Sequence, residues 1–154
     1  MGSYFLNEHH MKVSQPFLFD KLSSKTSRSF WRGALVRDVE LLLNDAARSG
    51  QLHLDNYPWC KNSVLNFGLP SLSRQLPVNA DALTIAHHIH SIIVLFEPRI
   101  DPRSIKVTPV VEKRQALVLA LLFDINGWSV IPELQAPISL RIALDYSCGA
   151  VSII

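Results

Sequence analysis

The stretch SIIVLFEPRI, residues 91–100, decides the fold because it ends an apolar helix and leads into three β-like segments. Pro98 has no backbone donor and disfavours helical dihedrals at the residue before it, so we expect the helix to end at or just before Glu97. Glu97 and Arg99 stand two residues apart in what we expect to be extended chain, where their side chains lean the same way. This acid and guanidinium either brace the fold or present a fixed ionic pair to a partner.

Two amphipathic helices are predicted from apolar residues that recur at spacings of three and four. We expect the first to run from a cap at Ser29 to Arg48, where Ser49-Gly50 ends it. Its inner stripe consists of Trp31, Leu35, Val39, Leu42 and Leu43. The second should start near Asn79 or Asp81, since either can cap it. Its inner stripe consists of Leu83, Ala86, Ile89, Ile93 and Phe96, widened by Ile85 and Ile92.

Strands are predicted after the second helix. Apolar and polar residues alternate over 105–112, where Pro109 indicates an edge strand or a bulge. Residues 116–125 are apolar on both faces, as expected of a central strand covered on each side. Residues 138–146 alternate as a half-buried strand, and residues 151–154 form a short final one. Helices first and strands afterwards indicate an α+β fold, with two main helices packed on a small, mostly antiparallel sheet.

The 154 residues fit one domain, residues 29–154, preceded by an N-terminal arm, residues 1–28. The arm holds an apolar group, Phe17, Leu18 and Phe19, which docks either on its own domain or on a partner. The segment SVLNFGLP, residues 63–70, lies in an otherwise irregular stretch over 50–80. Asn66 and Gly68 can take turn conformations there, and a loop this long with apolar anchors is typical of an ordered, functional one.

Composition excludes several classes of protein. A net charge of +2 is too small for nucleic-acid binding, which needs a dense basic patch. The apolar runs are far shorter than a membrane span, and no secretory signal is visible, so we expect a cytoplasmic protein without membrane insertion. Cys60 and Cys148 are far apart, which favours two buried reduced thiols over a disulfide.

Catalytic signals are weak. Glu97, Asp101, Asp124 and Glu133 are candidates for a glycosidase pair, but no two stand out by spacing. Arg99 beside Glu97 favours the charged carboxylate, the wrong direction for a general acid. His87, His88 and His90 cluster without a nearby cysteine or carboxylate to complete a metal site. A nucleophile elbow, a phosphate loop and a dinucleotide fingerprint are all missing, so we expect no catalytic, cofactor or metal residues.

Four segments in order resemble the TssE family of type VI secretion baseplates, related to the wedge protein of contractile phage tails. Phe17-Leu18-Phe19-Asp20-Lys21-Leu22 is similar to its N-terminal motif, and VRDVELLLN, residues 36–44, to its first helix. SVLNFGLP, residues 63–70, resembles the family's SVLNYGLP loop, and FEPRI, residues 96–100, its Glu-Pro-Arg signature. Two positions depart from the pattern: Asp45-Ala46-Ala47 replaces the Thr-Arg that follows Asn44 in the family, and Phe67 stands where Tyr is common.

The resemblance implies a non-enzymatic subunit of the baseplate, assembled at the cytoplasmic face of the inner membrane. It implies binding to the wedge subunits TssF and TssG, and further contacts with TssK and the sheath subunits TssB and TssC, whose first ring its strands would template. The residues expected to contact partners are Phe17, Leu18, Phe19, Asn66, Gly68, Glu97, Pro98 and Arg99. Two alternatives stay open: a peptidoglycan hydrolase, since relatives carry a lysozyme-like label, and a self-associating adaptor.

Overall fold

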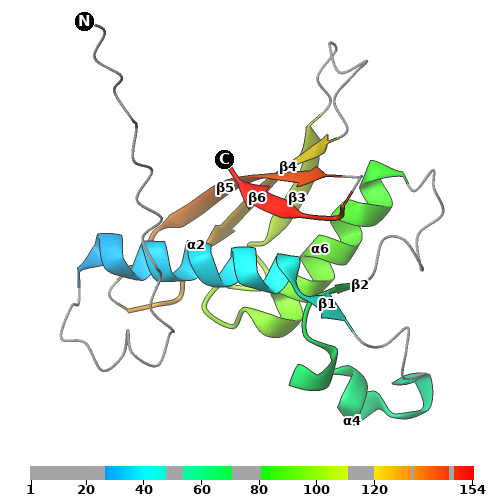
Figure 1. Ribbon diagram of the computed structural model, residues 1–154. Coiled ribbons are helices and arrows are strands. Elements are labelled where there is room, and N and C mark those ends of the chain that lie inside the picture. Colours follow the sequence, from blue (N-terminus) through cyan, green and yellow to red (C-terminus); the bar gives the residue numbers. More distant parts are fainter. Residues whose placement is uncertain (1–26, 48–53, 71–80, 111–119, 133, 146–147) are drawn as a thin grey trace, which may run out of the picture.

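A four-stranded antiparallel sheet packs on two long helices in the computed structural model, which describes residues 27–47, 54–70, 81–110, 120–132, 134–145 and 148–154 (Figure 1). The strands follow each other in chain order across the sheet, as a meander. The helices are α2 (Arg28–Asn44) and α6 (Ala82–Phe96), and the strands are β3 (Lys106–Val110), β4 (Ala120–Trp128), β5 (Pro137–Asp145) and β6 (Val151–Ile153). The predicted α+β fold is confirmed. The expected N-terminal arm lies outside the described residues.

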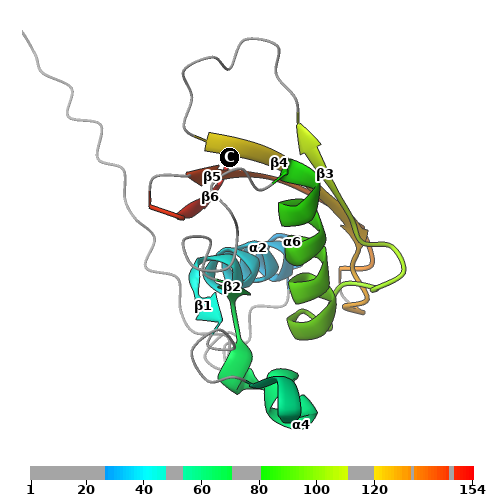
Figure 2. The same cartoon turned by 90° about the vertical axis from the view of Figure 1, so that its right-hand side faces the viewer.

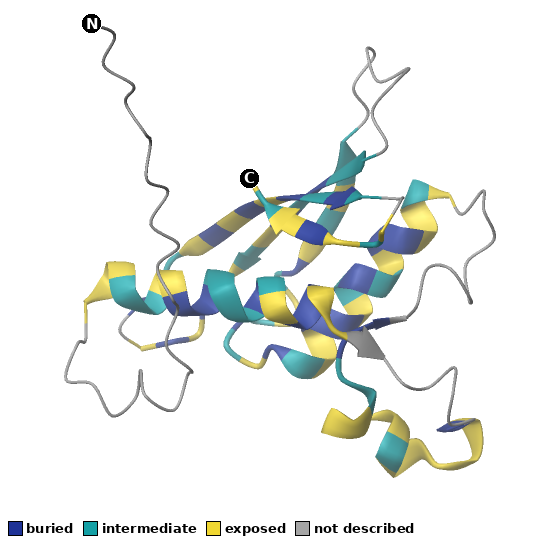
Figure 3. Cartoon of the chain, viewed as in Figure 1, coloured by how far each residue is buried: buried dark blue, intermediate teal, exposed yellow. Residues whose placement is uncertain are grey.

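Both helices lie on the same face of the sheet (Figure 2), so the core forms between them and alternate residues of the strands. Buried and exposed residues alternate along β5 (Figure 3), and Phe123 of β4 is fully buried opposite Ile142 of β5. The prediction that the central strand is covered on both faces is wrong. Asp124 points to the face away from the helices, where it pairs with Arg141, and Asn126 is exposed there.

Helix α2 begins and ends earlier than the sequence predicts. Its cap is Ser27 instead of Ser29, and its last residue is Asn44 instead of Arg48. Asp45 takes an extended conformation, and the next two residues form β1 (Ala46–Ala47), which pairs in parallel with β2 (Leu69–Pro70). The amide of Leu69 donates to the Asp45 carbonyl at 2.9 Å. Pairing with a distant segment therefore overrides the helical preference of two alanines.

Helix α6 is capped by Asp81 and has Phe96 as its last residue, so it ends just before Glu97, as predicted. Its buried face is centred on Ile85, Ile89 and Ile93, which are all fully buried. Leu83, expected in the inner stripe, is 56% exposed. Two residues cover about 200° of helix, so Leu83 cannot share a face with Ile85. Ile85, which was expected only to widen the stripe, lies at its centre.

A small excursion connects α2 to α6 and projects from the body beside β1 and β2 (Figure 1). It consists of η1 (Leu54–Asn56), α4 (Pro58–Lys61) and η2 (Val64–Asn66), where the sequence predicts only irregular chain. Cys60 in α4 is half-buried and Cys148, in the turn before β6, is exposed; both are free thiols. The prediction that both are buried is wrong, because each lies in a surface connection. Within the described residues, no helix combines the length and the apolar character needed to cross a membrane.

Candidate functional site

The Glu-Pro-Arg segment forms a turn at the end of α6. The amide of Glu97 donates to the Ile93 carbonyl at 2.9 Å and closes the helix, and the amide of Ile100 donates to the Glu97 carbonyl at 3.2 Å. The Glu97 carboxylate accepts a hydrogen bond from the Arg99 amide at 3.1 Å. The segment is thus a turn and not the extended chain that we predicted. Its side chains meet because the carboxylate bonds to the turn's own backbone.

Glu97 and Arg99 form a bidentate ion pair that reaches α2. Arg99 Nε donates to Glu97 Oε1 at 2.6 Å, and Arg99 Nη2 donates to Glu97 Oε2. The same Nη2 lies 3.0 Å from Asp38 Oδ2, and Arg37 Nε donates to Asp38 Oδ1 at 2.8 Å. Charges of alternating sign therefore run from the end of α6 to the middle of α2. We call Arg37, Asp38, Glu97 and Arg99 the ionic corner.

Burial makes the ionic corner energetically demanding. Glu97 is only 4% exposed, and the Arg99 side chain 18%. Burial by itself would lower the pKa of Arg99, but the hydrogen bond and charge of Glu97, together with Asp38, raise it above its usual value. The guanidinium therefore stays charged, and each carboxylate beside it keeps a cation. Removing one member of such a buried pair costs about 3–5 kcal/mol, because its partner is left uncompensated.

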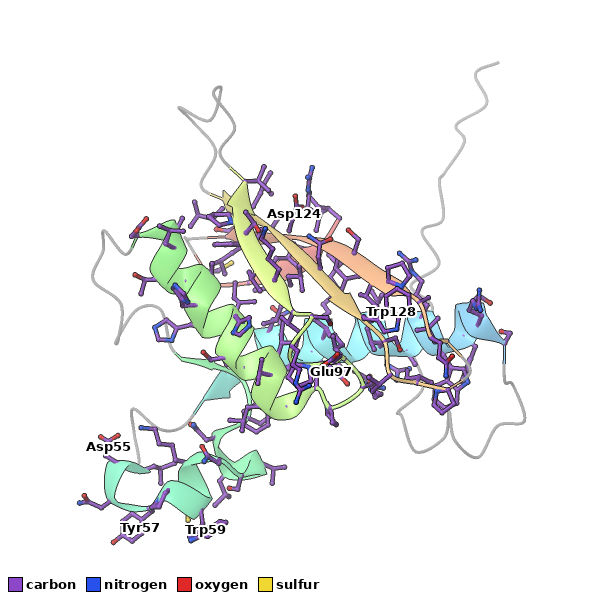
Figure 4. The ribbon with its side chains drawn as sticks, turned by 180° about the vertical axis from the view of Figure 1, so that it is seen from behind. Asp55, Tyr57, Trp59, Glu97, Asp124 and Trp128 are labelled. Atoms are coloured by element: carbon purple, nitrogen blue, oxygen red, sulfur yellow. The ribbon has the colours of Figure 1, made fainter. Side chains whose placement is uncertain are left out.

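The residues around the ionic corner join it to the sheet. Asp101 donates its amide to the Trp128 carbonyl, and Val130 donates to the Arg99 carbonyl, each at 2.9 Å. Ile100 pairs with Ser129 in an isolated antiparallel bridge. A Cβ on Gly127 would come within 2.8 Å of the Ile100 Cγ2 methyl, so only glycine lets the turn approach β4 this closely. Figure 4 shows Glu97 at the end of α6, beside α2, and Trp128 at the end of β4.

The SVLNFGLP segment anchors the excursion to the body. Phe67 packs edge-on against Phe96, with ring centroids 5.4 Å apart, immediately before the ionic corner. Gly68 has φ of 108°, which only glycine adopts without strain, and Leu69 is buried in the core. Asn66 donates from its side-chain amide to the Lys61 carbonyl at 3.0 Å. The predicted turn at Gly68 is confirmed, and Asn66 holds the excursion together locally.

Asn44, at the end of α2, binds the edge of the sheet. Its Nδ2 donates to the Val151 carbonyl at 2.7 Å, and its Oδ1 accepts from the Val151 amide at 2.9 Å. Bonds from Asp145 to Ala150 and from Ile154 to Arg141 place the even-numbered residues of this segment toward β5, so the backbone groups of Val151 face outward. The amide of Asn44 therefore occupies one position of the β6 edge, as a neighbouring strand would.

The residues predicted to contact partners have different environments. Glu97 and Gly68 are buried, Arg99 and Asn66 are half-buried, and Pro98 is exposed. Phe17, Leu18 and Phe19 lie outside the described residues. All eight stay predictions as partner contacts, and the structure makes Pro98 the most accessible member of the Glu-Pro-Arg segment.

Four residues were missed as parts of the site: Arg37, Asp38, Asn44 and Gly127. The first three lie in the VRDVELLLN motif, which was a signal of their importance but not of their partners. Gly127 carries no local signal, because its contact with Ile100 arises only when the turn packs on β4.

Three of the four candidate acids for catalysis are engaged in structural contacts. Glu97 binds Arg99, Asp124 binds Arg141 with two hydrogen bonds, and Asp101 accepts from the Arg103 amide at 3.0 Å. Glu133 lies outside the described residues. In the described part of the chain, no three His, Cys, Asp or Glu side chains group closely enough to hold a metal ion. The arrangement fixes the relative position of two helices and a sheet, and this is a structural task.

A comparison with protein families shows which family the chain belongs to. The family described as baseplate wedge protein gp25 matches residues 32–129, which include most of α2, the SVLNFGLP segment, the ionic corner, β3 and β4. Searches of curated proteins and of solved structures give no match. The match covers well over half of the chain, so the protein belongs to the family of baseplate wedge protein gp25, which includes TssE, and has a structural role in the baseplate of a contractile injection system.

Proposed function

We propose that the chain is a non-enzymatic subunit of a type VI secretion baseplate, which binds the wedge subunits TssF and TssG at the cytoplasmic face of the inner membrane. The observation that carries the proposal is the family match over 32–129, because the ionic corner lies inside it and follows the Glu-Pro-Arg signature of TssE. Further contacts with TssK and with the sheath subunits TssB and TssC belong to the same proposal.

The ionic corner acts as a rigid mount for a contact surface. Arg99 pairs with Asp38 of α2, and its carbonyl accepts a hydrogen bond from the Val130 amide. The chain at Pro98, between Arg99 and the end of α6, therefore has little freedom. Trp128 and Val130, whose backbones bond to Asp101 and Arg99 just after Pro98, are 48% and 50% exposed. A pre-ordered surface with exposed apolar side chains binds a partner with less loss of conformational entropy. This surface, Pro98 with Trp128 and Val130, is our candidate for the wedge contact.

The sheet edges are the candidates for pairing with a sheath strand. Among the described residues, β3 and β6 are the two edges of the sheet. The Asn44 side chain already binds the backbone amide and carbonyl of Val151. An added strand could therefore pair with β6 only through backbone groups beyond Val151. Strand addition needs a run of unpaired backbone groups. The longer β3 is therefore the better acceptor, although Pro109 lacks one donor.

The lack of enzymatic activity is part of the proposal. A general acid must hold a proton within reach of its substrate. Glu97 is instead buried and bonded to a guanidinium, and Asp124 is paired with Arg141. A carboxylate bonded to a guanidinium is held in its charged form, so neither Glu97 nor Asp124 is suited to donate a proton. We therefore expect purified protein to release no muropeptides from peptidoglycan.

The test is co-purification of the chain with TssF and TssG of the same organism. Because replacing Arg99 would leave Glu97 buried without its cation and is expected to destabilise the fold, the informative change is Pro98→Gln, which alters an exposed side chain of the Glu-Pro-Arg segment. We expect it to weaken co-purification, while its thermal unfolding shifts no more than that of the control, because both variants lose a proline that restricts the unfolded chain. Pro102→Gln is the matched control, since Pro102 is an exposed proline of the next turn.

Three results would contradict the proposal. Failure of the wild-type chain to co-purify with TssF and TssG would remove the assigned partners. Equal binding by the Pro98→Gln and wild-type proteins would remove the corner as the contact. Muropeptide release that disappears in Glu97→Gln and persists in Asp124→Asn would restore the hydrolase alternative.

A further inference from the structure

The excursion between α2 and α6 carries exposed aromatic side chains at its tip. Trp59 is 89% exposed and Tyr57 61%, and Figure 4 shows both at the end of the excursion, pointing away from the body. Val64 and Leu65 on the adjacent η2 are 81% and 55% exposed. Single exposed apolar residues are ordinary, but a cluster of large ones within nine residues is a mark of an interaction surface. We call Tyr57 and Trp59 the aromatic tip.

The aromatic tip is rigidly built. Pro58 starts α4, and the Lys61 amide donates to the Tyr57 carbonyl at 2.9 Å. Ser63 Oγ donates to the Cys60 carbonyl at 2.8 Å, and Asn66 spans back to Lys61. These bonds fix a segment whose largest side chains contribute little to its own core. Order without burial is what an anchor needs, because its conformational entropy is already lost before binding.

The charge of the excursion is balanced. Lys61 Nζ lies 3.0 Å from Asp55 Oδ1, and these two are the charged residues of the stretch from η1 to η2. A surface without net charge is not drawn to an anionic membrane, nor to a strongly charged protein face. Trp and Tyr are instead the residues that most often dominate protein interfaces, seated in desolvated pockets. The chemistry fits a neutral, apolar recess.

The area of the aromatic tip argues against simple self-association. A Trp or Tyr buries about 150–250 Å², so two tips meeting face to face would bury roughly 600–1,000 Å² in total. Stable interfaces bury about 1,200–2,000 Å². A projecting tip gains more when a concave surface encloses it on several sides. A second copy is therefore the weaker candidate for its partner.

We propose that the aromatic tip inserts, as an anchor, into a neutral apolar groove on a wedge subunit of the baseplate. This inference rests on the proposed function and adds to it a second contact, separate from the ionic corner. Trp59 fills the groove and Tyr57 packs at its rim, with the Asp55–Lys61 pair left in water. The separate contact at Pro98 sets the orientation of the bound chain.

The experiment measures binding of the full chain to a purified TssF–TssG complex, by biolayer interferometry, with Trp59→Ala as the test variant. We expect affinity to fall about 30-fold or more, the size of a hot-spot truncation. Leu83→Ala, which removes a 56% exposed side chain at the start of α6, is the control and should bind as the wild type. Both variants should keep the wild-type unfolding midpoint, because neither side chain is buried.

Cys60 supplies a second readout within the same protein. It is a half-buried free thiol next to Trp59, so docking of the tip should slow its alkylation by N-ethylmaleimide in the wild-type complex, as read by mass spectrometry. The Trp59→Ala protein, mixed at the same concentrations, should lose this protection.

The outcomes separate the two proposals. If the wild type binds but Trp59→Ala binds equally, or Cys60 stays fully reactive, the anchor is wrong and the proposed function stands. If the wild type does not bind TssF–TssG, the proposed function and the anchor both fail. A dimer of the lone chain that disappears in Trp59→Ala would assign the tip to a second copy. Trp59-dependent binding to phosphatidylglycerol vesicles would assign it to a membrane.

Discussion

Two carboxylate–guanidinium pairs of the same chemistry occupy opposite environments in this protein. Glu97–Arg99 lies between α6 and α2, with the carboxylate 4% exposed, whereas Asp124–Arg141 joins β4 and β5 on the open face of the sheet. Both pairs are bidentate. The two pairs differ in what surrounds the remaining charge once one partner is removed. The inner pair leaves a buried charge with nothing to solvate it, and the outer pair returns two ions to solvent.

The largest effect is expected from breaking the inner pair. Arg99→Met keeps much of the side-chain volume but leaves Glu97 buried without its cation, so we expect the free energy of unfolding to fall by about 3–5 kcal/mol. Urea unfolding followed by circular dichroism measures this loss. Arg141→Met is the matched control on the outer pair and should change the urea midpoint far less. Equal losses in the two variants would show that burial does not distinguish the pairs.

A second, smaller effect is expected from the turn that carries the inner pair. Gly127→Ala forces a Cβ to within 2.8 Å of Ile100 Cγ2, and we expect a loss of about 1–3 kcal/mol from overpacking. The control is Gly33→Ala in α2, where nothing lies within 4 Å of the added Cβ. Alanine there should stabilise the helix by about 0.5–1 kcal/mol. Thermal unfolding of both variants tests this expectation. Unfolding midpoints that shift in the same direction would contradict the explanation by packing.

The sequence predicted features that depend on neighbouring residues and missed those that depend on distant ones. The end of α6 at Glu97 follows from Pro98 alone, and the β5 strand from its alternation. The early end of α2 depends on pairing between Ala46 and Leu69, and no local pattern carries that information.

The candidate site divides in the same way. Glu97 and Arg99 were predicted to meet because they are two residues apart. Asp38 joins them only because α2 crosses the end of α6, and Gly127 is required only because the turn packs on β4. Both are consequences of tertiary packing, which periodicity and spacing do not contain.

A third prediction concerns Asn44, whose amide closes part of the sheet edge. Asn44→Ala leaves the amide and carbonyl of Val151 without their side-chain partners, and we expect a loss of about 1 kcal/mol, since the site is only partly buried. Hydrogen exchange of the Val151 amide should become faster. The Ile154 amide, which donates to the Arg141 carbonyl, is the internal reference. Unchanged exchange at Val151 would mean that Asn44 does not guard the edge.

The smallest effect is expected from the outer pair, and it depends on pH. The hydrogen bond from Arg141 lowers the pKa of Asp124 below its ordinary value of 3.8. A carboxyl whose pKa is lower in the folded than in the unfolded state stabilises the fold above the unfolded value, and this contribution is lost as the pH falls through the folded value. Asp124→Asn should therefore slightly reduce stability at pH 7 and become indistinguishable from the wild type below the folded pKa. Because the side chains of Arg141 and Asp124 are 46% and 34% exposed, solvent and salt screen the pair, so the difference at pH 7 should shrink further in 1 M NaCl. A difference between the two proteins that persists unchanged in strong acid would mean that Asp124 acts through packing and not through its charge.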